Sequence, residues 1–182
     1  ITSNVSSMKD LFGWCSSLSS LDLSSFDTSK VTDMSEMFIR CNSLKKLDLS
    51  SFETQNVTDI SFMFCCCYYL SELNLSSFDA AHLELVDYCF EALWNLSILD
   101  MGNLSFSSVN TSSLNNNFSG LGDRVGLCYI RCAPETKTAI LRINEEMSSS
   151  PKYHWFDIND NLPENIDGRD SDTYYSSDYS MD

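Results

Sequence analysis

Residues 18–44 read LSSLDLSSFDTSKVTDMSEMFIRCNSL, and the same pattern recurs along the first two-thirds of the chain. Phe26, Phe52 and Phe78 mark it at a constant interval of 26 residues, and each ends a Leu-x-x-Leu-x-Leu-Ser-Ser-Phe sequence. Units this small cannot bury an apolar face alone, so they stack on their neighbours as a solenoid. We therefore predict an elongated array that functions through a surface instead of a deep pocket.

Other apolar positions keep the same interval and should line the core of the array. One column consists of cysteines, which pack as small hydrophobic residues when they are buried. The columns are Val5, Val31, Val57, Leu83 and Val109; Met8, Met34, Ile60 and Val86; Phe12, Phe38, Phe64 and Phe90; Cys15, Cys41 and Cys67, followed by Leu93; and Leu18, Leu44, Leu70 and Leu96.

Each unit is predicted to contain a short strand, a polar turn and a short helix. Residues 44–49 alternate in the manner of a strand, and Ser50-Ser51 supplies the turn. In residues 58–64 a capping residue precedes apolar positions at helical spacing, and Asp33 with Glu36 has the spacing of a capping box. We expect an α/β solenoid, similar to a leucine-rich-repeat array, with a parallel sheet.

The repeat weakens near Leu104 and is lost by residues 115–117, which divides the chain into three parts. Residues 1–118 form the array of about four and a half units. Residues 119–158 are predicted to form a C-terminal α/β cap, with strands at 127–131 and 153–158 and a helix that begins at Pro134. Residues 159–182 are acidic and polar, and we expect them to be disordered.

Charge and hydropathy restrict the partners. The formal net charge of −15 disfavours nucleic acid and anionic membrane surfaces, which bind clustered lysine and arginine. No apolar run approaches the roughly 20 residues that span a bilayer, so no membrane insertion is expected in this segment. The chain begins with Ile1 in the middle of a repeat, and we expect it to be a fragment of a longer protein.

The unit from Leu18 to Leu44 resembles the leucine-rich repeats of BspA-like bacterial surface proteins. The likeness includes Val-Thr-Asp-Met-Ser at residues 31–35 and Met-Phe-x-x-Cys at residues 37–41, and it extends over roughly residues 1–118. The third unit departs from it, with Cys89-Phe90 in place of Met-Phe. The resemblance implies a secreted or cell-surface bacterial protein that adheres to host proteins or other cells, without catalysis.

The sequence offers no catalytic, cofactor or metal constellation. His82 and His154 are its only histidines, and the motifs of hydrolases, zinc proteases and dinucleotide-binding loops are absent. Cys65-Cys66-Cys67 lacks the paired Cys-x-x-Cys spacing of zinc sites, and neighbours in an extended chain point in opposite directions. We predict a protein that is not an enzyme and binds no metal or cofactor.

Two surface columns are candidate partner-binding sites. The first lies between the strand leucines and should face outward, where it either attracts a cationic partner or is merely solvated; it contains Asp22, Asp48, Asn74 and Asp100. The second turns aromatic only in later units, where it either anchors a protein partner or covers the approach to the cap; it contains Tyr68 and Trp94, with Tyr69 beside them.

We expect these surfaces to make the chain an adhesion or recognition module that contacts a protein partner, such as a host extracellular-matrix or surface protein. The alternative is a structural spacer that holds another domain, outside this segment, away from the cell envelope. The sequence does not determine the identity of the ligand or the oligomeric state.

Overall fold

The computed structural model describes residues 2–79, 81–102, 104–106, 108–109, 111–114, 117–125, 128–143 and 153–156. The predicted acidic tail, residues 159–182, lies outside these ranges, as does the end of the strand predicted at 153–158. Within the described part of the chain, neither helix combines the length and the apolar character needed to cross a membrane.

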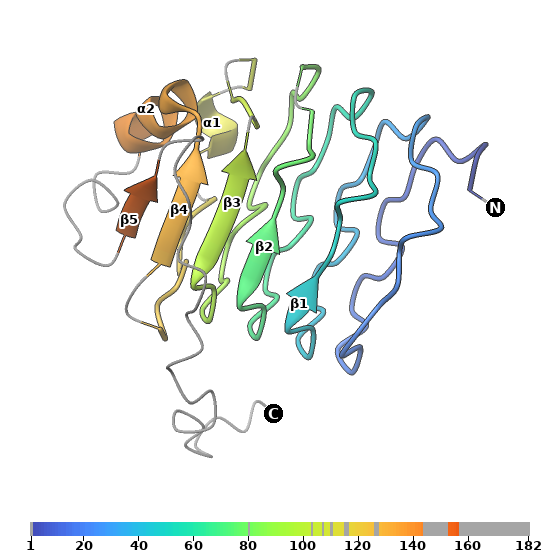
Figure 1. Ribbon diagram of the computed structural model, residues 1–182, viewed down its shortest axis with the longest axis horizontal. Helices are drawn as coiled ribbons and strands as arrows, with labels where there is room; N and C mark the ends of the chain where they lie inside the picture. The colour runs from blue at the N-terminus through green and yellow to red at the C-terminus, as the bar shows by residue number, and fades with distance from the viewer. Residues whose placement is uncertain are drawn as a thin grey trace.

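The described strands form a single parallel sheet in the order β1-β2-β3-β4-β5 (Figure 1). Three strands belong to the repeats: β1 (Lys46–Leu47), β2 (Glu72–Asn74) and β3 (Ile98–Gly102). Each strand is part of a different coil of a solenoid. Their register places Leu47 beside Leu73 and Leu73 beside Leu99, which is the interval of the sequence repeat. The predicted parallel sheet and solenoid are confirmed, although β1 is shorter than the predicted strand.

The sheet continues past the regular repeats with a changed spacing. Helix α1 (Thr111–Leu114) follows the last regular unit, and β4 (Cys128–Cys132) then pairs with β3. Helix α2 (Pro134–Ile143) begins at the predicted proline and leads towards β5 (Tyr153–Phe156) at the edge of the sheet. Ile98 pairs with Tyr129, five residues later than the repeat would place its partner.

The predicted short helices of the repeats are wrong, because those segments form linked β-turns. Met34, Glu36, Phe38 and Arg40 donate their backbone N–H groups to carbonyl oxygens of the next coil at 2.8–3.0 Å. The intervening amides of Met37, Ile39 and Cys41 donate three residues back, within their own coil. This pattern, here called the turn ladder, also runs from Met8 to Trp14 and from Ile60 to Cys66, and it closes the solenoid opposite the sheet. In the last repeat coil Ala92 still donates to Ser119, whereas the amides of Val86 and Cys89 donate to the side chains of Ser113 and Asn117.

The spacing of the coils explains why the repeats contain linked turns where short helices were predicted. Adjacent strands lie about 4.8 Å apart, whereas an α-helix with its side chains is about 10 Å wide. Helices could therefore stack behind this sheet only if the array curved strongly. Hydrogen bonds join the coils on both faces, so the two faces have similar spacing. Asp33 and Asp59, which resembled helix caps, accept the amides of Ser35 and Ser61 in two-residue turns.

Left-handed backbone conformations terminate successive turns of the ladder. The positive φ angles lie between 55° and 61° and repeat at the interval of the sequence, at Asp10, Glu36, Phe62 and Tyr88, and at Trp14, Arg40, Cys66 and Ala92. Non-glycine residues in this region carry a steric cost of roughly 1–2 kcal/mol each, because Cβ approaches the carbonyl oxygen. The ladder holds them there through the hydrogen bonds between coils.

Ala92 allows that cost to be measured. Ala92→Gly is expected to raise the free energy of unfolding by about 1 kcal/mol, because glycine adopts positive φ freely and only one methyl group is lost. Ala139→Gly, inside α2, should instead lower it by about 1 kcal/mol. Chemical denaturation of both variants measures the difference, and an equal loss of stability in both would show that Ala92 is not strained.

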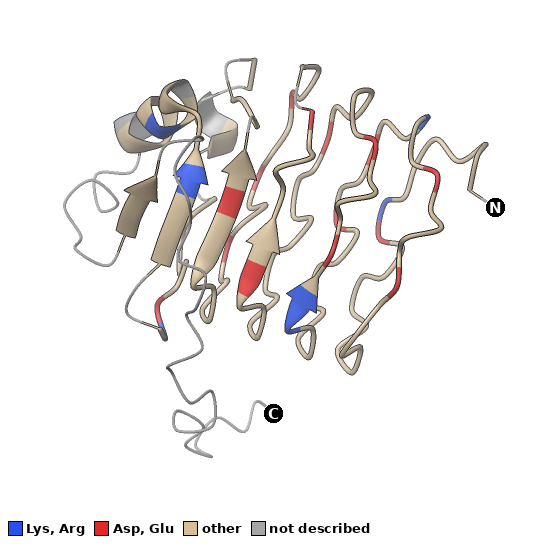
Figure 2. Ribbon diagram, in the orientation of Figure 1, with Lys and Arg blue, Asp and Glu red and all other residues tan. Residues whose placement is uncertain are grey.

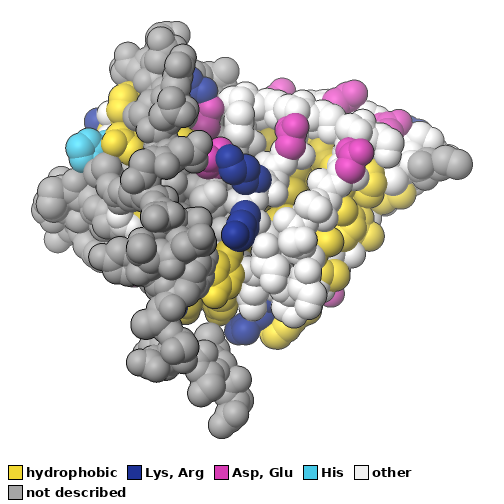
Figure 3. Space-filling view, turned by 60° about the horizontal axis from the view of Figure 1, so that its bottom comes forward, with side chains coloured by type: hydrophobic (Ala, Val, Ile, Leu, Met, Phe, Trp, Pro, Cys, Tyr) yellow, Lys and Arg dark blue, Asp and Glu magenta, His cyan; other side chains and the backbone are white. Residues whose placement is uncertain are grey.

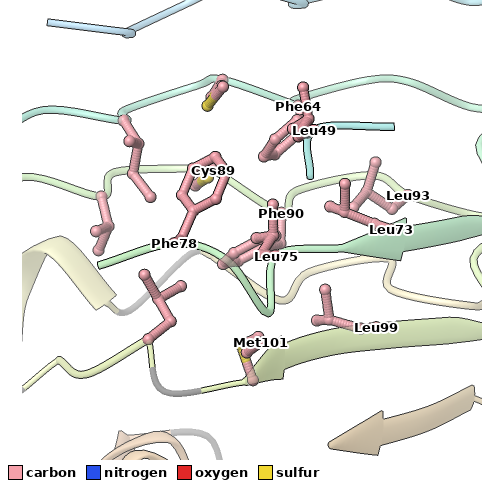
Figure 4. Packing of buried hydrophobic residues seen from close by; sticks show 14 of the residues in the cluster. Leu49, Phe64, Leu73, Leu75, Phe78, Cys89, Phe90, Leu93, Leu99 and Met101 are labelled. Atoms are coloured by element: carbon pink, nitrogen blue, oxygen red, sulfur yellow. The ribbon is translucent and has the colours of Figure 1, made fainter. Parts of the chain in front are cut away.

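The core is a continuous stack of apolar columns between the sheet and the turn ladder (Figure 4). Phe12, Phe38, Phe64, Phe90 and Phe118 form a row of stacked rings with centroids 5.5–6.3 Å apart. The predicted phenylalanine column is confirmed, and Phe118 extends it beyond the regular register. Figure 3 shows hydrophobic side chains gathered towards the N-terminal end of the visible face, where the first coil lies.

The repeated cysteines and threonines also connect the coils. Cys41 and Cys67 are fully buried, and their thiols donate to the carbonyl oxygens of Phe12 and Phe38 at 3.1 and 3.0 Å. Their expected place in the core is confirmed, whereas Cys15, in the first coil, is exposed. Buried Thr28 accepts the amide of Glu53 and donates to its carbonyl oxygen. No disulfide forms among the eight cysteines, all of which are described.

Candidate functional site

The predicted acidic row is primarily a set of turn-forming side chains. Asp22, Asp48 and Asn74 are exposed, as expected, and each accepts the backbone amide two residues later at 2.9–3.0 Å. Asparagine serves as well as aspartate in such a turn. The recurrence of these residues therefore has a structural cause, and Figure 2 shows acidic residues distributed over many coils instead of gathered in this row.

Asp100 does not face solvent, so its predicted exposure is wrong. Its side chain is 4% exposed and pairs with Arg131 of β4, whose Nε donates to Oδ1 at 3.0 Å and whose Nη2 donates to Oδ2. Asp100 also accepts the amide of Gly102. Arg131 lies outside the repeat register, which is why the column predicted a fourth exposed position. The row therefore presents only two carboxylates, at Asp22 and Asp48.

The exposed aspartates should titrate below the usual range. Backbone and side-chain hydrogen bonds from Ser24 and Ser50 lower the pKa values of Asp22 and Asp48. A depressed folded-state pKa contributes stability that is present above the unfolded value and is lost as the pH falls through the folded value. NMR titration of the Asp48 carboxyl group is expected to give a midpoint below about 3.9. A midpoint at or above that value would show that the turn does not form in solution.

The aromatic column forms a stack that ends on an arginine. The rings of Tyr68 and Trp94 lie 4.2 Å apart and nearly parallel, and the guanidinium carbon of Arg124 lies 4.6 Å from the centre of the Trp94 ring. We call these three residues the ledge. Tyr68 and Trp94 are half-buried and Arg124 is exposed. The structure thus brings together two of the predicted residues, whereas Tyr69 is half-buried beside them.

A backbone ladder fixes the ledge to the segment that follows the repeats. The amide of Ala92 donates to Ser119, and the amide of Arg124 donates to the carbonyl oxygen of Trp94 at 2.8 Å. Gly120 has a φ of 75° and lies against Trp94, where an added Cβ would come within 3.0 Å of the indole nitrogen. The column therefore does contact the segment after the array, as one of the two sequence interpretations proposed.

A second pair of the same kind lies on the turn ladder. The guanidinium carbon of Arg40 lies 4.6 Å from the centre of the Trp14 ring, and Trp14 is 62% exposed. Burial, and then a hydrogen bond with Cys66, raise the pKa of Tyr68 to about 12. The charge of Arg40 opposes this shift, which shows that Arg40 also lies near Tyr68. Tyr68 therefore remains neutral at physiological pH, and the two arginine–tryptophan pairs belong to one neighbourhood.

Sequence reasoning identified only part of this neighbourhood. Trp14 and Arg40 occupy one column of the repeat, together with Cys66 and Ala92, and could have been found from the register. Arg124 could not, because it follows the last regular unit. Cation–aromatic pairs contribute roughly 0.5–1 kcal/mol at exposed sites, and tryptophan, tyrosine and arginine are the residues enriched at the centres of protein interfaces.

The described residues contain no group of three or more histidine, cysteine, aspartate or glutamate side chains that could hold a metal ion. His82 and His154 are both exposed, and His154 is tilted against Tyr129 at 5.6 Å. The ledge and the Trp14–Arg40 pair present aromatic and guanidinium groups, which suit noncovalent contact.

The fold and the surface define a parallel β-solenoid with an aromatic and cationic ledge on an otherwise acidic chain. A family model described as "Mycoplasma protein of unknown function, DUF285" matches residues 1–100, more than half of the chain, so the protein belongs to this family. Comparison with curated proteins and with solved structures finds no match.

Proposed function

We propose that this chain is a non-enzymatic protein-recognition module of a secreted or cell-surface bacterial protein, and that the ledge is the centre of its contact surface. The supporting observation is the stack of Tyr68, Trp94 and Arg124. Its aromatic rings and guanidinium group are already held in one geometry, so little side-chain entropy is lost on binding. The resemblance to leucine-rich repeats of BspA-like surface proteins supports the proposed location and a protein partner from a host or another cell.

The geometry also favours a partner with acidic or aromatic side chains at the ledge. Arg124 is exposed on one side of Trp94, and Arg40 lies near Tyr68, so two guanidinium groups are available for bidentate contact with carboxylates. The acidic remainder of the chain should repel an acidic partner elsewhere and so fix its orientation.

Binding measurements with the purified chain on immobilised extracellular-matrix proteins and on whole host cells test this function. We expect saturable binding that Trp94→Ala weakens about 30-fold, the effect of losing a central anchor worth about 2 kcal/mol. Leu85→Ala removes another exposed apolar side chain outside the ledge and should leave binding unchanged. Equal binding by wild type and Trp94→Ala would contradict the role of the ledge.

A structural spacer is the second candidate, and the coil-to-coil hydrogen bonds favour it. The recurring polar residues Thr28, Thr54 and Ser71 all bond to neighbouring coils, which stiffens the array. A spacer needs no specific ligand. Absence of saturable binding to every surface in the same experiment would therefore support the spacer and contradict recognition.

A further inference from the structure

Two adjacent thiols lie together on the turn ladder. The Sγ atoms of Cys65 and Cys66 are 3.4 Å apart, which contradicts the expectation that neighbouring side chains point in opposite directions. That expectation assumed an extended chain, whereas Cys66 has a φ of 61° and terminates a turn. Cys65 is buried and Cys66 is half-buried, so one thiol of the pair is accessible and the other lies behind it.

The hydrogen bonds between coils hold this pair rigidly. The carbonyl oxygen of Cys65 accepts the amide of Arg40 at 2.9 Å, and the amide of Cys66 donates to Glu91 at 3.0 Å. The peptide that joins the two cysteines is thus bonded to the coils on both sides. The two sulfur atoms are kept close without any need for the backbone to move.

The charged neighbours make the two thiols different. The bond with Cys65, the bond with Tyr68 and the charge of Arg40 lower the pKa of Cys66 to about 6, against the opposing effects of burial and Glu91. The Cys65 thiol lies 3.4 Å from Glu91 Oε2, and the bond with Cys66, burial and Glu91 raise its pKa. Cys66 is therefore the nucleophile, and Cys65 retains its proton.

We propose that Cys65 and Cys66 form a thiol–disulfide exchange site that reacts with low-molecular-weight disulfides. The Cys66 thiolate attacks one sulfur of the disulfide, a mixed disulfide forms, and one thiolate leaves. Cys65 then loses its proton and attacks Cys66 Sγ, which forms the Cys65–Cys66 bond and releases the second small thiol. The protein loses two electrons and two protons, and the small disulfide is reduced to two thiols.

The product should be easily reduced. Adjacent Cα atoms lie about 3.8 Å apart across a trans peptide, below the 4.4–6.8 Å usual for disulfides. A ring closed at this separation is strained, and strained disulfides have more oxidising potentials. The site is therefore suited to reversible exchange, and not to permanent cross-linking.

Reaction of the folded chain with oxidised glutathione tests the proposal. Cys15→Ser provides the background, because Cys15 is exposed, whereas every other cysteine except half-buried Cys66 is buried. In this background we expect a product lighter by two hydrogen atoms, with the bond mapped to Cys65 and Cys66. Adding Cys65→Ser should trap one glutathione on Cys66, and adding Cys66→Ser should abolish the reaction. Circular dichroism establishes that each variant is folded.

The dependence of the rate on pH separates this site from an ordinary thiol. The charged and titratable groups around Cys66 are Cys65, Tyr68, Arg40 and Glu91. Trapping on Cys66 in the Cys65→Ser variant should change less than about two-fold between pH 7 and 8.5, because the serine hydroxyl can donate in place of the Cys65 thiol while Tyr68 and Arg40 remain beside Cys66. When the same variant is unfolded in urea, the rate of trapping on Cys66 should rise about fifteen-fold from pH 7 to pH 8.5, as expected for a thiol with a pKa near 8.5.

Three results would overturn the proposal. The first is no change in mass of the folded Cys15→Ser chain. The second is a stable glutathione adduct on that chain without closure of the Cys65–Cys66 bond. The third is modification that persists when Cys66 is replaced by serine.

Discussion

Replacing Phe64 with alanine is expected to lower the free energy of unfolding by about 3–5 kcal/mol, the usual range for a buried phenylalanine. Phe64 is fully buried, and its ring lies between Phe38 at 6.0 Å and Phe90 at 6.3 Å. The coils above and below are joined by hydrogen bonds on both faces, so they cannot collapse into the vacated space. Urea denaturation followed by circular dichroism and tryptophan fluorescence measures the change.

Phe62→Ala is the matched control, because it truncates a phenylalanine in the same coil. Phe62 is half-buried and stacks on Tyr88 at 4.9 Å outside the phenylalanine row. Alanine retains the Cβ, so the cost of positive φ at this position is unchanged. We expect a loss of about 1 kcal/mol. Equal losses in the two variants would contradict a core built on the phenylalanine row.

The second large effect is expected at the ion pair between β3 and β4. Asp100→Asn should lower the free energy of unfolding by about 2–4 kcal/mol, because it removes the buried carboxylate charge that pairs with the guanidinium of Arg131. The amide oxygen can still accept the amide of Gly102, as Asn74 accepts that of Ser76 one coil earlier. The loss therefore reports the ion pair and not the turn.

Asp48→Asn provides the matched control, because Asp48 occupies the same column but is exposed and makes only the turn. We expect it to lose much less stability at pH 7 than Asp100→Asn, because the amide oxygen can still accept the amide of Ser50 and only the small contribution of the lowered Asp48 pKa is lost. Denaturation of both variants should show that the requirement for a carboxylate is confined to Asp100. If Asp100→Asn lowered stability no more than Asp48→Asn, the contact between β3 and β4 would not depend on the ion pair.

The sequence repeat predicted what depends on the spacing between coils. Leu47, Leu73 and Leu99 follow one another in the sheet, and Phe38, Phe64 and Phe90 follow one another in the core, because stacking converts a sequence interval into a spatial row. The same reasoning placed Cys41 and Cys67 correctly. Apolar columns are informative because every coil must bury the same face.

The repeat did not predict how the coils return to the sheet. Apolar residues at helical spacing between residues 58 and 64 are also compatible with linked turns, since both conformations place every third or fourth side chain inward. Hydrogen bonds to the next coil decide between them. The repeat predicted an exposed position for Asp100 and a surface aromatic at Trp94, but it did not predict their partners Arg131 and Arg124. Both arginines follow the last regular unit, where the 26-residue interval no longer holds.

The polar residues of the repeat are explained by structure, which directs the search for function to residues that do not repeat. Thr28, Asp48 and Asp59 recur because they close turns or join coils. Trp94 and Cys66 have no such counterparts in the other coils. The ledge and the thiol pair are built on such non-repeating residues. The two sites lie close together, since Cys66 of the thiol pair bonds to Tyr68 of the ledge.

The central structural claim is that alternate amides of the turn ladder bond to the next coil. NMR detection of couplings across hydrogen bonds tests it directly at Phe38, whose amide donates to the carbonyl oxygen of Met63 at 3.0 Å. We expect a coupling between the amide nitrogen of Phe38 and the carbonyl carbon of Met63. A coupling from Phe38 to Met34, four residues back as in an α-helix, would contradict the turn ladder and restore a helical repeat.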